Sequence, residues 1–369
     1  MESAARALTS AIKAEAHRLG FELVGVTTPE PPPHIQTYEE WLDAGRHASM
    51  GYLNTEPARA RRADPRLILP ECQSILVLGI RYDNPLKTES GESSKYQLSS
   101  VKMDRAESRG RVAAYAWGDD YHLVLSPRLE ALVVFIQEQV GRKIAHRYYT
   151  DTGPILERDL AQRAGLGWIG KNTCLINPRE GSYFLLAEIL LELALEADLP
   201  FPADMCGTCT RCIQACPTGC IRPDRTLEAG RCISYLTIEN KAEIPADLRP
   251  LQGDWIFGCD VCQMVCPWNI RFARENGDPG LAPQPDPPFP VLVDEMTLTP
   301  REFNAAYKRS PIRRAKRRGY LRNVAVALGN RGERSSLPVL REALDDEEEL
   351  VKGHARWAIS RIEPNKEDG

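Results

Sequence analysis

Cys206-Gly-Thr-Cys209-Thr-Arg-Cys212-Ile-Gln-Ala-Cys216-Pro217 has the cysteine spacing that wraps three thiolates around one iron–sulfur cube. A second group follows as Cys259-Asp-Val-Cys262-Gln-Met-Val-Cys266-Pro267, and Cys232 precedes it. Together the two groups supply the eight thiolates that two [4Fe–4S] clusters require. The sequence therefore predicts a ferredoxin-like unit with two clusters.

The ligands are expected to cross between the two clusters. In runs of this spacing the fourth cysteine ligates the neighbouring cube, because the turn and the proline carry it away from the first three. We therefore assign Cys206, Cys209, Cys212 and Cys266 to one cluster, and Cys216, Cys232, Cys259 and Cys262 to the other. Zinc and disulfides are the alternatives. Zinc needs only two CxxC pairs, so the longer run favours the clusters.

Composition sets the broad class of protein. A chain of 369 residues with 43% hydrophobic residues is long enough for two or three domains with real cores. Eleven cysteines without an N-terminal signal segment indicate a reducing compartment, so we expect a cytoplasmic protein. Glu188 and Glu192 interrupt the longest apolar run, which excludes a membrane span. Because the net charge is −4, binding of nucleic acid would need a local basic patch.

The first 198 residues are predicted to form an α/β domain, because stretches with strand and helix periodicity alternate along the chain. Asp119-Asp120 can cap the long helix, and Pro154 is expected at the first position of the next helix. No GxGxxG follows a strand, so nothing indicates a dinucleotide cofactor. The expected helices cover 2–19, 38–47 and 121–140, and the expected strands cover 21–26, 74–80, 111–117, 144–149 and 183–193.

Two stretches of this domain are candidates for a site. Asp151 follows a predicted strand and precedes a helix, where ligands of α/β sheets usually bind, and it could act as a general acid. The alternative is a loop aspartate that accepts hydrogen bonds from backbone N–H groups. The glycine-rich stretch 165–172 could let the backbone approach a bulky ligand beside Lys171 and Asn172, or it could be a plain tight turn. Cys72, Cys174 and Cys220 are interpreted as ordinary buried thiols.

The C-terminal part is predicted to be helical and basic. Residues 279–290 hold six prolines and are expected to form an extended connector. Residues 303–332 then hold nine Lys or Arg and no Asp or Glu, which favours contact with nucleic-acid phosphates over a solvated helix face. Helices are expected at 320–329, 337–344 and 350–362 with the spacing of a HEAT-like pair. The phosphate-contacting candidates are Arg313, Arg314, Lys316, Arg317, Arg318 and Arg322.

The chain resembles the epoxyqueuosine reductase family. The resemblance lies in the two-cluster spacing with its long gap from Cys232 to Cys259, and in four other features. These are Tyr149-Thr-Asp-Thr-Gly-Pro-Ile-Leu-Glu-Arg158, Gly167-Trp-Ile-Gly-Lys-Asn172, Arg231-Cys-Ile-Ser-Tyr235 and the HEAT-like tail. It implies reduction of epoxyqueuosine to queuosine at the wobble position of a tRNA, the last step of queuosine biosynthesis.

The resemblance also implies the parts of the enzyme. Residues 1–198 would bind base-off cobalamin and carry the catalytic site, 199–270 would hold the two [4Fe–4S] clusters, and 271–369 would contact tRNA. Asp151 would be the proton donor, and an external low-potential electron donor would feed a monomeric enzyme. The positions that match the cobalamin-contacting segments of the family are Arg62, Ala114, Lys171, Asn172 and Ser234.

Two other readings of the sequence stay open. A reductive dehalogenase also combines a corrinoid with two such clusters, but it is usually exported and has no need of a basic HEAT-like tail. A ferredoxin-type electron carrier would leave most of the chain without a role. The missing export signal and the basic stretch favour the tRNA-modifying reductase over both.

Overall fold

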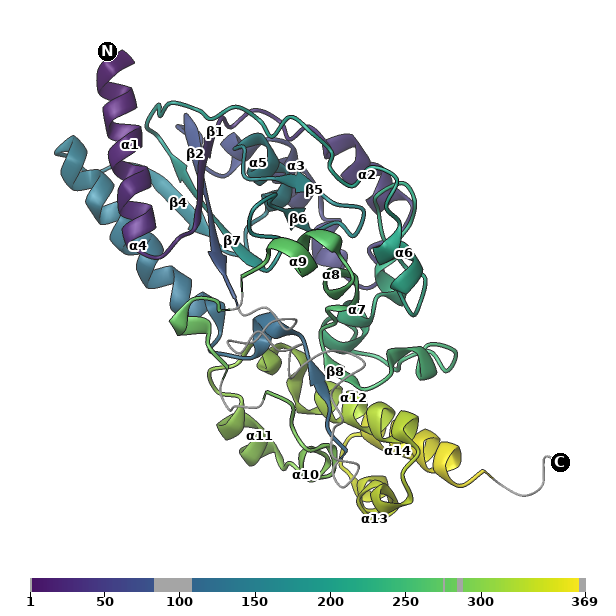
Figure 1. The fold of residues 1–369 in the computed structure, drawn as a ribbon. Helices are drawn as coiled ribbons and strands as arrows, with labels where there is room; N and C mark the ends of the chain where they lie inside the picture. Colours follow the sequence, from purple (N-terminus) through teal and green to yellow (C-terminus); the bar gives the residue numbers. More distant parts are fainter. Residues whose placement is uncertain (1, 83–107, 275, 284–287, 365–369) are drawn as a thin grey trace.

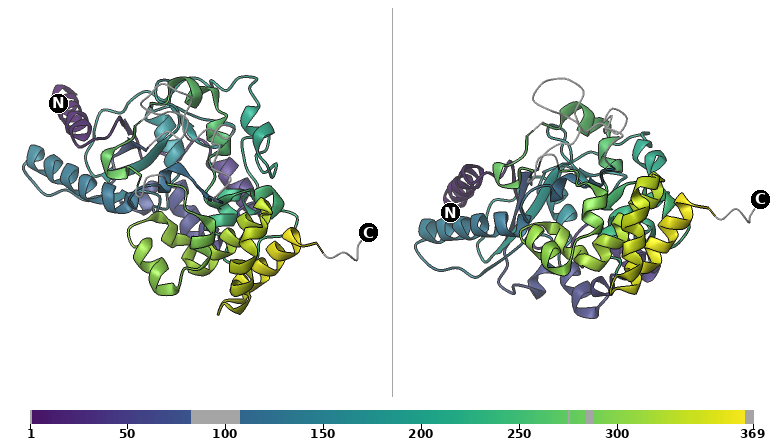
Figure 2. Two further views of the ribbon diagram at one scale, coloured as in Figure 1. Left: turned by 60° about the horizontal axis from the view of Figure 1, so that its bottom comes forward. Right: turned by 90° about the horizontal axis from the view of Figure 1, so that it is seen from below.

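The computed structural model describes residues 2–82, 108–274, 276–283 and 288–364. An upper part built on a β-sheet stands above a helical lower part, and a group of short helices lies beside both (Figure 1). The first and the last helix of the chain lie far apart in every view (Figures 1 and 2). No helix of the described residues is long and apolar enough to cross a membrane.

The central sheet has four strands, and every neighbouring pair is antiparallel. In sheet order they are β1 (Leu23–Thr27), β2 (Ser74–Arg81), β7 (Phe184–Leu191) and β4 (His146–Tyr149). Strand β2 is apolar at nearly every position because both of its faces are covered. Leu76 and Leu78 point into one core, whereas Ile75 and Val77 point into the other.

Helices cover both faces of the sheet. On one face, α1 (Glu2–Arg18) and α4 (Tyr121–Val140) bury side chains such as Ile12 and Leu125 in the main core. On the other face, α5 (Glu157–Arg163) buries Leu160 in a second core. The helices α2 (Ile35–Asp43) and α3 (Glu56–Ala63) follow β1 in the chain.

Most predicted elements of this part are confirmed to within a few residues. The long helix has the predicted bounds, and the Asp120 carboxylate caps it by accepting a hydrogen bond from the His122 N–H at 3.1 Å. Gly141 ends the helix in the left-handed conformation, at φ +68°. The alternation of helices and strands favours parallel pairing, but this sheet is antiparallel throughout its described strands.

Two predictions about this part are wrong. The strand expected over 111–117 is only β3 (Arg111–Val112), and the chain then turns through a short 3₁₀ helix at Ala114–Ala116. The Asp260 carboxylate accepts the Ala114 N–H at 2.6 Å, which holds this turn in place. Pro154 does not begin a helix, because α5 starts three residues later, after a turn in which Asp151 has φ +60°.

The cysteine-rich unit consists of short elements that pack beside the sheet. Strand β8 (Trp255–Phe257) pairs in parallel with β3 and so joins this unit to the sheet-containing part. A small hairpin of β5 (Trp168–Ile169) and β6 (Leu175–Ile176) begins in the glycine-rich stretch and ends just after it. The helices of the unit are α6 (Arg211–Ala215), α7 (Ile233–Ile238), α8 (Val261–Met264) and α9 (Pro267–Phe272).

The lower part is helical, as predicted, and α12 (Lys316–Arg331) runs through its middle. Its residues from Gly319 to Gly329 are buried, so it is a core helix and not a surface helix. Buried side chains of this part belong to the same apolar core as Ile12 and Leu125. The domain boundaries at residues 198 and 270 stay a prediction. The other helices are α10 (Leu292–Met296), α11 (Pro300–Ala306), α13 (Leu337–Glu342) and α14 (Glu349–Ile362).

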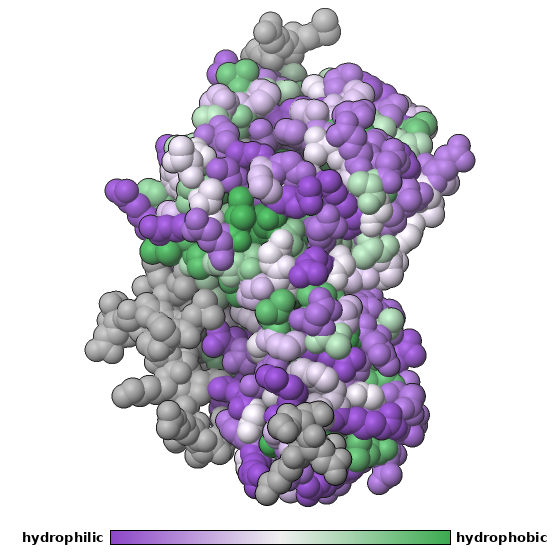
Figure 3. Space-filling view, turned by 90° about the vertical axis from the view of Figure 1, so that its right-hand side faces the viewer, coloured by the Kyte–Doolittle hydropathy of each residue, from purple (hydrophilic) through white to green (hydrophobic). Residues whose placement is uncertain are grey.

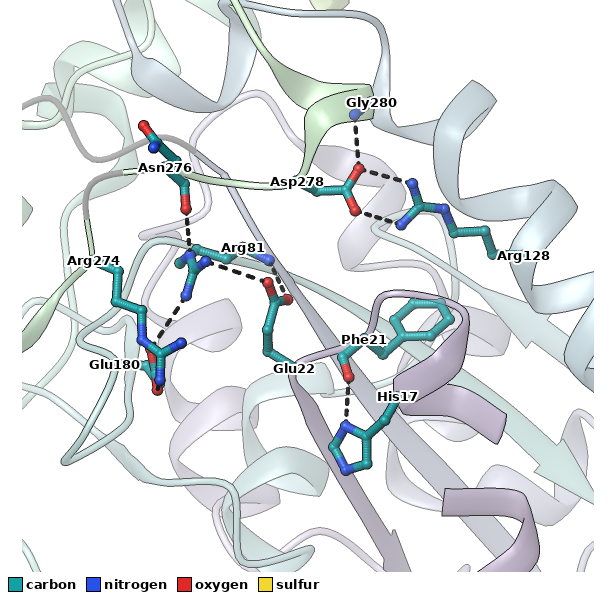
Figure 4. A network of polar contacts seen from close by, with 10 residues as sticks. All are labelled: His17, Phe21, Glu22, Arg81, Arg128, Glu180, Arg274, Asn276, Asp278 and Gly280. Carbon is teal, nitrogen blue, oxygen red and sulfur yellow. Dashed lines mark hydrogen bonds and ion pairs between the residues drawn. The ribbon is translucent and has the colours of Figure 1, made fainter. Parts of the chain in front are cut away.

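The proline-rich connector begins as a structured segment. Its first residues form a 3₁₀ helix at Pro279–Leu281, whereas residues 284–287 lie outside the described part of the chain. Just before it, both carboxylate oxygens of Asp278 accept hydrogen bonds from Arg128, at 2.7 and 2.8 Å (Figure 4). Arg81 of β2 donates to the Asn276 carbonyl at 2.8 Å. These contacts hold the start of the connector against the sheet and α4.

Candidate active site and cluster-binding cysteines

The first predicted ligand set lines one cavity. The side chains of Cys206, Cys209, Cys212 and Cys266 share a hollow of about 330 Å³, although Cys266 lies more than fifty residues further along the chain. Trp168 contacts this set, because its indole N–H donates a hydrogen bond to the Cys206 sulfur at 3.4 Å. The chain therefore brings together the four thiols that crossed ligation requires for one cube.

The second predicted set is also gathered in one place, together with two further thiols. Cys220 contacts both Cys216 and Cys232, and the sulfur atoms of Cys216 and Cys220 are 3.4 Å apart. The hydrogen bond that Cys220 donates is the main cause that lowers the pKa of Cys216 to about 5. Cys174 contacts Cys262. Cys174 and Cys220 are thus neighbours of predicted ligands, which their interpretation as ordinary buried thiols missed.

The geometry of these thiols bears on what they could hold. No three His, Cys, Asp or Glu side chains of the described ranges are arranged to hold a single metal ion. The first set instead stands around a hollow, as the ligands of a cube do.

Asp151 occupies an unusual backbone conformation at the end of β4. Its φ of +60° is in the left-handed region, where only a few per cent of non-glycine residues lie and where aspartate is enriched. The Tyr121 hydroxyl donates to the Asp151 carboxylate at 2.8 Å, and Arg314 pairs with the same oxygen at 3.0 Å. The side chain is 47% exposed. The turn therefore presents this carboxylate to solvent and to a large ligand from a fixed position.

An aromatic wall connects Asp151 with the second cysteine set. The ring of Tyr115 lies 6.2 Å from that of Tyr121 and 6.2 Å from that of Phe257. Tyr115 also packs on the apolar cluster that includes Cys259. Burial raises the pKa of both Tyr115 and Tyr121, so both phenols stay neutral.

Two glutamates lie behind Asp151; Glu157 is partly accessible to solvent, whereas Glu188 is fully buried. The Glu157 carboxylate accepts a hydrogen bond from the Asp151 N–H at 2.7 Å, and burial, helped by the charge of Asp151, raises the pKa of Glu157 to about 7. Glu188 of β7 is 0% exposed, and neither of its oxygens has a hydrogen-bond partner among the described residues. Burial raises the pKa of Glu188 well above its ordinary value. Sequence reasoning missed both residues, although Glu188 visibly interrupts an apolar strand.

The five residues predicted to contact cobalamin lie in different parts of the molecule. Lys171 and Asn172 line the cavity of the first cysteine set, where the Lys171 ammonium donates to the Gly207 and Cys209 carbonyls at 2.7 and 3.0 Å. The Asn172 side chain is 4% exposed, and its amide nitrogen has no partner within the described ranges. Arg62 is buried near Glu157, with its guanidinium over the ring of Tyr38.

The other two predicted cobalamin contacts lie on the cysteine-rich side. The N–H of Ala114 is occupied by Asp260, as described for the turn after β3. Ser234 is in the first turn of α7, directly after Cys232. The structure therefore does not gather all five positions in one cavity.

The predicted phosphate contacts differ sharply in exposure. Arg313, Lys316 and Arg318 are exposed, whereas Arg317 is half-buried and pairs with Asp346. Arg322 is 0% exposed, and its guanidinium donates to the backbone carbonyls of Leu236, Asn240 and Ala242. Its two remaining donor contacts go to the Asn323 side-chain oxygen, so the N–H groups of Arg322 are occupied inside the core and a phosphate cannot reach them in this structure. Arg322 is therefore withdrawn from the predicted contacts.

Comparison with known proteins decides the family. The chain is 38% identical to the epoxyqueuosine reductase of Pseudomonas aeruginosa over 96% of this chain and 94% of that protein. This chain belongs to the epoxyqueuosine reductase family. The Escherichia coli epoxyqueuosine reductase is 36% identical over 96% of this chain and 89% of its own length. The chain is accordingly an oxidoreductase, and the dehalogenase and electron-carrier readings give way to this one.

Family models and solved structures agree with this assignment. A model described as "4Fe-4S double cluster binding domain" matches residues 205–269, and one described as "Epoxyqueuosine reductase QueG, DUF1730" matches residues 62–152. A crystal structure of an epoxyqueuosine reductase with an epoxyqueuosine-modified tRNA-Tyr stem loop has a TM-score of 0.85 and 31% identity, covering 96% of this chain and 90% of that one. The reductase of Streptococcus thermophilus has a TM-score of 0.83 and 28% identity, covering 95% and 89%.

Proposed function

We propose that this enzyme reduces epoxyqueuosine to queuosine at the wobble position of tRNA, with Asp151 as the proton donor. One observation carries the proposal: Asp151 lies where three parts of the molecule meet. It follows a strand of the sheet, it contacts Tyr121 and through Tyr115 the apolar cluster of Cys259, and it pairs with Arg314 of the basic stretch. The proposed acid therefore lies near a proposed cluster ligand and near a residue of the proposed phosphate-binding stretch.

The reaction defines what the site must supply. Converting an epoxide to an alkene consumes two electrons and two protons and releases the oxygen as water. The carbon–oxygen bonds break more easily when the leaving oxygen is protonated, so a positioned acid accelerates the step. Asp151 is suited to this role, because its turn and the Tyr121 hydroxyl fix the position of the carboxyl group.

Electrons would reach the substrate through two [4Fe–4S] clusters. We propose Cys206, Cys209, Cys212 and Cys266 as ligands of one cluster and Cys216, Cys232, Cys259 and Cys262 as ligands of the other. The lining of a single cavity by the first set supports this assignment. The Trp168 N–H beside Cys206 would stabilise the added negative charge of a reduced cluster. An external low-potential donor would supply the electrons.

Cobalamin is proposed as the second cofactor, and when bound it would supply a strongly reducing centre next to the substrate. Arg62, Ala114, Lys171, Asn172 and Ser234 are the residues proposed to hold it. The buried Asn172 amide without a hydrogen-bond partner fits a polar group that arrives with a ligand, because buried amides are otherwise paired. Arg62 supplies a buried cation near Glu157, on the Asp151 side of the molecule.

The tRNA is proposed to lie across the basic stretch. Arg313, Lys316 and Arg318 present exposed cations close in sequence to Arg314, which reaches Asp151. A related enzyme has been solved with a modified tRNA stem loop, and one from Bacillus subtilis has its catalytic aspartate loop swung out of the active site. We further propose a cytoplasmic monomer in which residues 1–198 bind cobalamin, 199–270 hold the clusters and the HEAT-like 271–369 contact tRNA.

Mass spectrometry of tRNA nucleosides tests this proposal in the cell. A strain that lacks this chain should accumulate epoxyqueuosine in place of queuosine, and expression of the chain should restore queuosine. If deletion leaves queuosine unchanged in a strain without a second such enzyme, the proposed function is wrong.

A further inference from the structure

Glu188 is a buried acid that has no role in the proposed reaction as described above. It lies in the middle of β7, opposite Val77 of β2 and Tyr149 of β4, and it is 0% exposed. Neither carboxyl oxygen has a hydrogen-bond partner within the described ranges. Burying an ionised carboxylate without a partner costs several kcal/mol, so a neutral, protonated carboxyl group is strongly preferred there.

The ionisable neighbours that influence Glu188 most are acids. The charges that act on it are those of Glu157 and Asp151. Glu157 in turn lies within reach of Arg158 and Arg62, and it is tied to Asp151 by the hydrogen bond from the Asp151 N–H at 2.7 Å. Three carboxyl groups therefore run from the sheet interior to the surface in the order Glu188, Glu157, Asp151. Burial and the repulsion between neighbouring carboxylates raise the pKa of Glu188 and of Glu157, so these two groups hold protons near neutral pH.

The reaction consumes two protons, and the three carboxyl groups could supply them. One proton goes to the epoxide oxygen as the first carbon–oxygen bond breaks, and a second completes the water as the other bond breaks and the two electrons form the alkene. A single aspartate carries one proton. A second proton must therefore arrive at Asp151 within each turnover, at a site that tRNA would shield from solvent.

We propose that Glu157 and Glu188 form a proton store that resupplies Asp151 during the reaction. The inference rests on the proposed function, and it adds two positioning residues that hold protons without touching the substrate. Glu188 keeps a proton in the dry interior, and Glu157 passes it to Asp151, whose backbone it already contacts. Solvent refills the store after the tRNA leaves.

The first test is the pH dependence of a single turnover by chemically reduced holoenzyme on epoxyqueuosine tRNA. Glu157→Gln and Glu188→Gln keep the shape of each side chain but remove its proton. Each variant should react at nearly the normal rate at pH 6, where solvent protons are plentiful, and roughly tenfold more slowly at pH 8. Glu192→Gln is the matched control, because Glu192 lies just after the same strand but pairs with Arg142 at the surface, and its profile should match that of the unmodified enzyme.

The second test does not depend on turnover. Infrared spectra of the unmodified holoenzyme and of each variant are recorded at pH 7 and subtracted. The carbonyl band of a protonated carboxyl group should be lost in Glu188→Gln and kept in Glu192→Gln. Absence of that band, or pH profiles of both store variants that coincide with that of the unmodified enzyme, would overturn the proton store. Failure of the unmodified enzyme to convert the tRNA at any pH would instead overturn the proposed function, and the infrared band would still decide whether Glu188 holds a proton.

Discussion

At the scale of single residues, Asp151 shows how backbone and side chain act together. A left-handed backbone at a non-glycine residue costs of the order of 1 kcal/mol, and the chain tolerates this cost where a side chain must point in one direction. The Tyr121 hydroxyl and Arg314 then fix the carboxylate. The strain and the two contacts are consistent with a catalytic side chain rather than a simple loop cap.

Asp151→Asn should remove the transferable proton and leave the shape of the site intact. We expect single-turnover conversion of epoxyqueuosine tRNA to slow by about 10² or more, the usual loss when a general acid is removed. Cluster content and tRNA affinity should not change. Asp345→Asn, an exposed carboxylate of the lower part, serves as the control. A near-normal rate in Asp151→Asn would return this residue to the role of a loop cap.

His354 provides a test of the packing of α14. Burial lowers its pKa from the ordinary 6.5 to about 4, and its ring accepts a hydrogen bond from the Ile244 N–H at 3.2 Å. Below pH 6.5 the imidazole of His354 binds a proton in the unfolded chain but stays neutral in the folded chain until the pH nears 4. The free energy of unfolding therefore falls as the pH decreases. Between pH 6.5 and pH 5 the loss should be about 2 kcal/mol.

Thermal unfolding of the holoprotein, followed by circular dichroism, measures this loss. The melting temperature of His354→Gln should fall less between pH 6.5 and pH 5 than that of the unmodified protein. Equal shifts in the two proteins would show that His354 does not control this part of the acid response.

Residue-scale prediction from sequence reaches furthest where chemistry requires a spacing, and it fails where only packing decides. The cysteine sets follow from a ligand pattern, and the structure gathers the first set in one cavity. Arg322 and Arg318 differ by four positions in the same basic stretch, yet one is buried and the other exposed. The charge of a residue does not reveal which face of a helix is buried, so that distinction needed the fold. In the sequence, Glu188 is only a charged residue that interrupts an apolar strand, and its acidic neighbours become apparent only in the fold.

At the scale of elements, the basic stretch divides into a structural part and an exposed part. Its closely spaced cations begin in a 3₁₀ helix, η7 (Pro311–Ala315), and continue into α12, most of which is buried. The spacing of apolar residues predicted the helix but not its central position. The central position of α12 is stabilised by Arg322 and Asn323. Their side chains donate hydrogen bonds to backbone carbonyls of the segment 236–242 and so hold α12 against the cysteine-rich unit.

Neutralising the exposed cations should weaken tRNA binding through phosphate contacts. We expect Arg313→Gln, Lys316→Gln and Arg318→Gln together to lower affinity, and each lost contact to reduce the slope of log affinity against log salt by roughly 0.7 to 0.9. Filter binding over a range of salt concentrations measures both effects. The matched control neutralises Arg334, Arg341 and Arg356, exposed cations elsewhere in the lower part. Equal affinities and slopes in the two variants would place the tRNA elsewhere.

At the scale of the whole molecule, the parts are joined more closely than the sequence suggests. Strand β8 of the cysteine-rich unit pairs with β3, and the apolar core runs from α1 to α14. Composition marks a proline-rich connector, but it does not reveal that Asp278 at its start is fixed by Arg128. Figure 3 shows apolar side chains gathered at the middle of one face, between the upper and lower parts of the molecule.

Iron content tests the arrangement of the clusters. Anaerobically reconstituted protein should hold about eight irons, and Cys266→Ser should lose about four, from the cluster that also uses Cys206. Cys72→Ser is the control, because Cys72 is buried beside the sheet away from both sets and should keep the full content. About four irons in the unmodified protein would contradict the account of two cubes.

The most direct test of the central claim is conversion of the substrate by the purified enzyme. Anaerobically reconstituted protein, loaded with iron, sulfide and cobalamin and reduced chemically, is incubated with tRNA that carries epoxyqueuosine, and the nucleosides are analysed by mass spectrometry. The account predicts that the epoxyqueuosine nucleoside loses one oxygen atom and becomes queuosine, and that it does so only when reductant is present. Unchanged epoxyqueuosine in the presence of fully loaded and reduced enzyme would contradict the account.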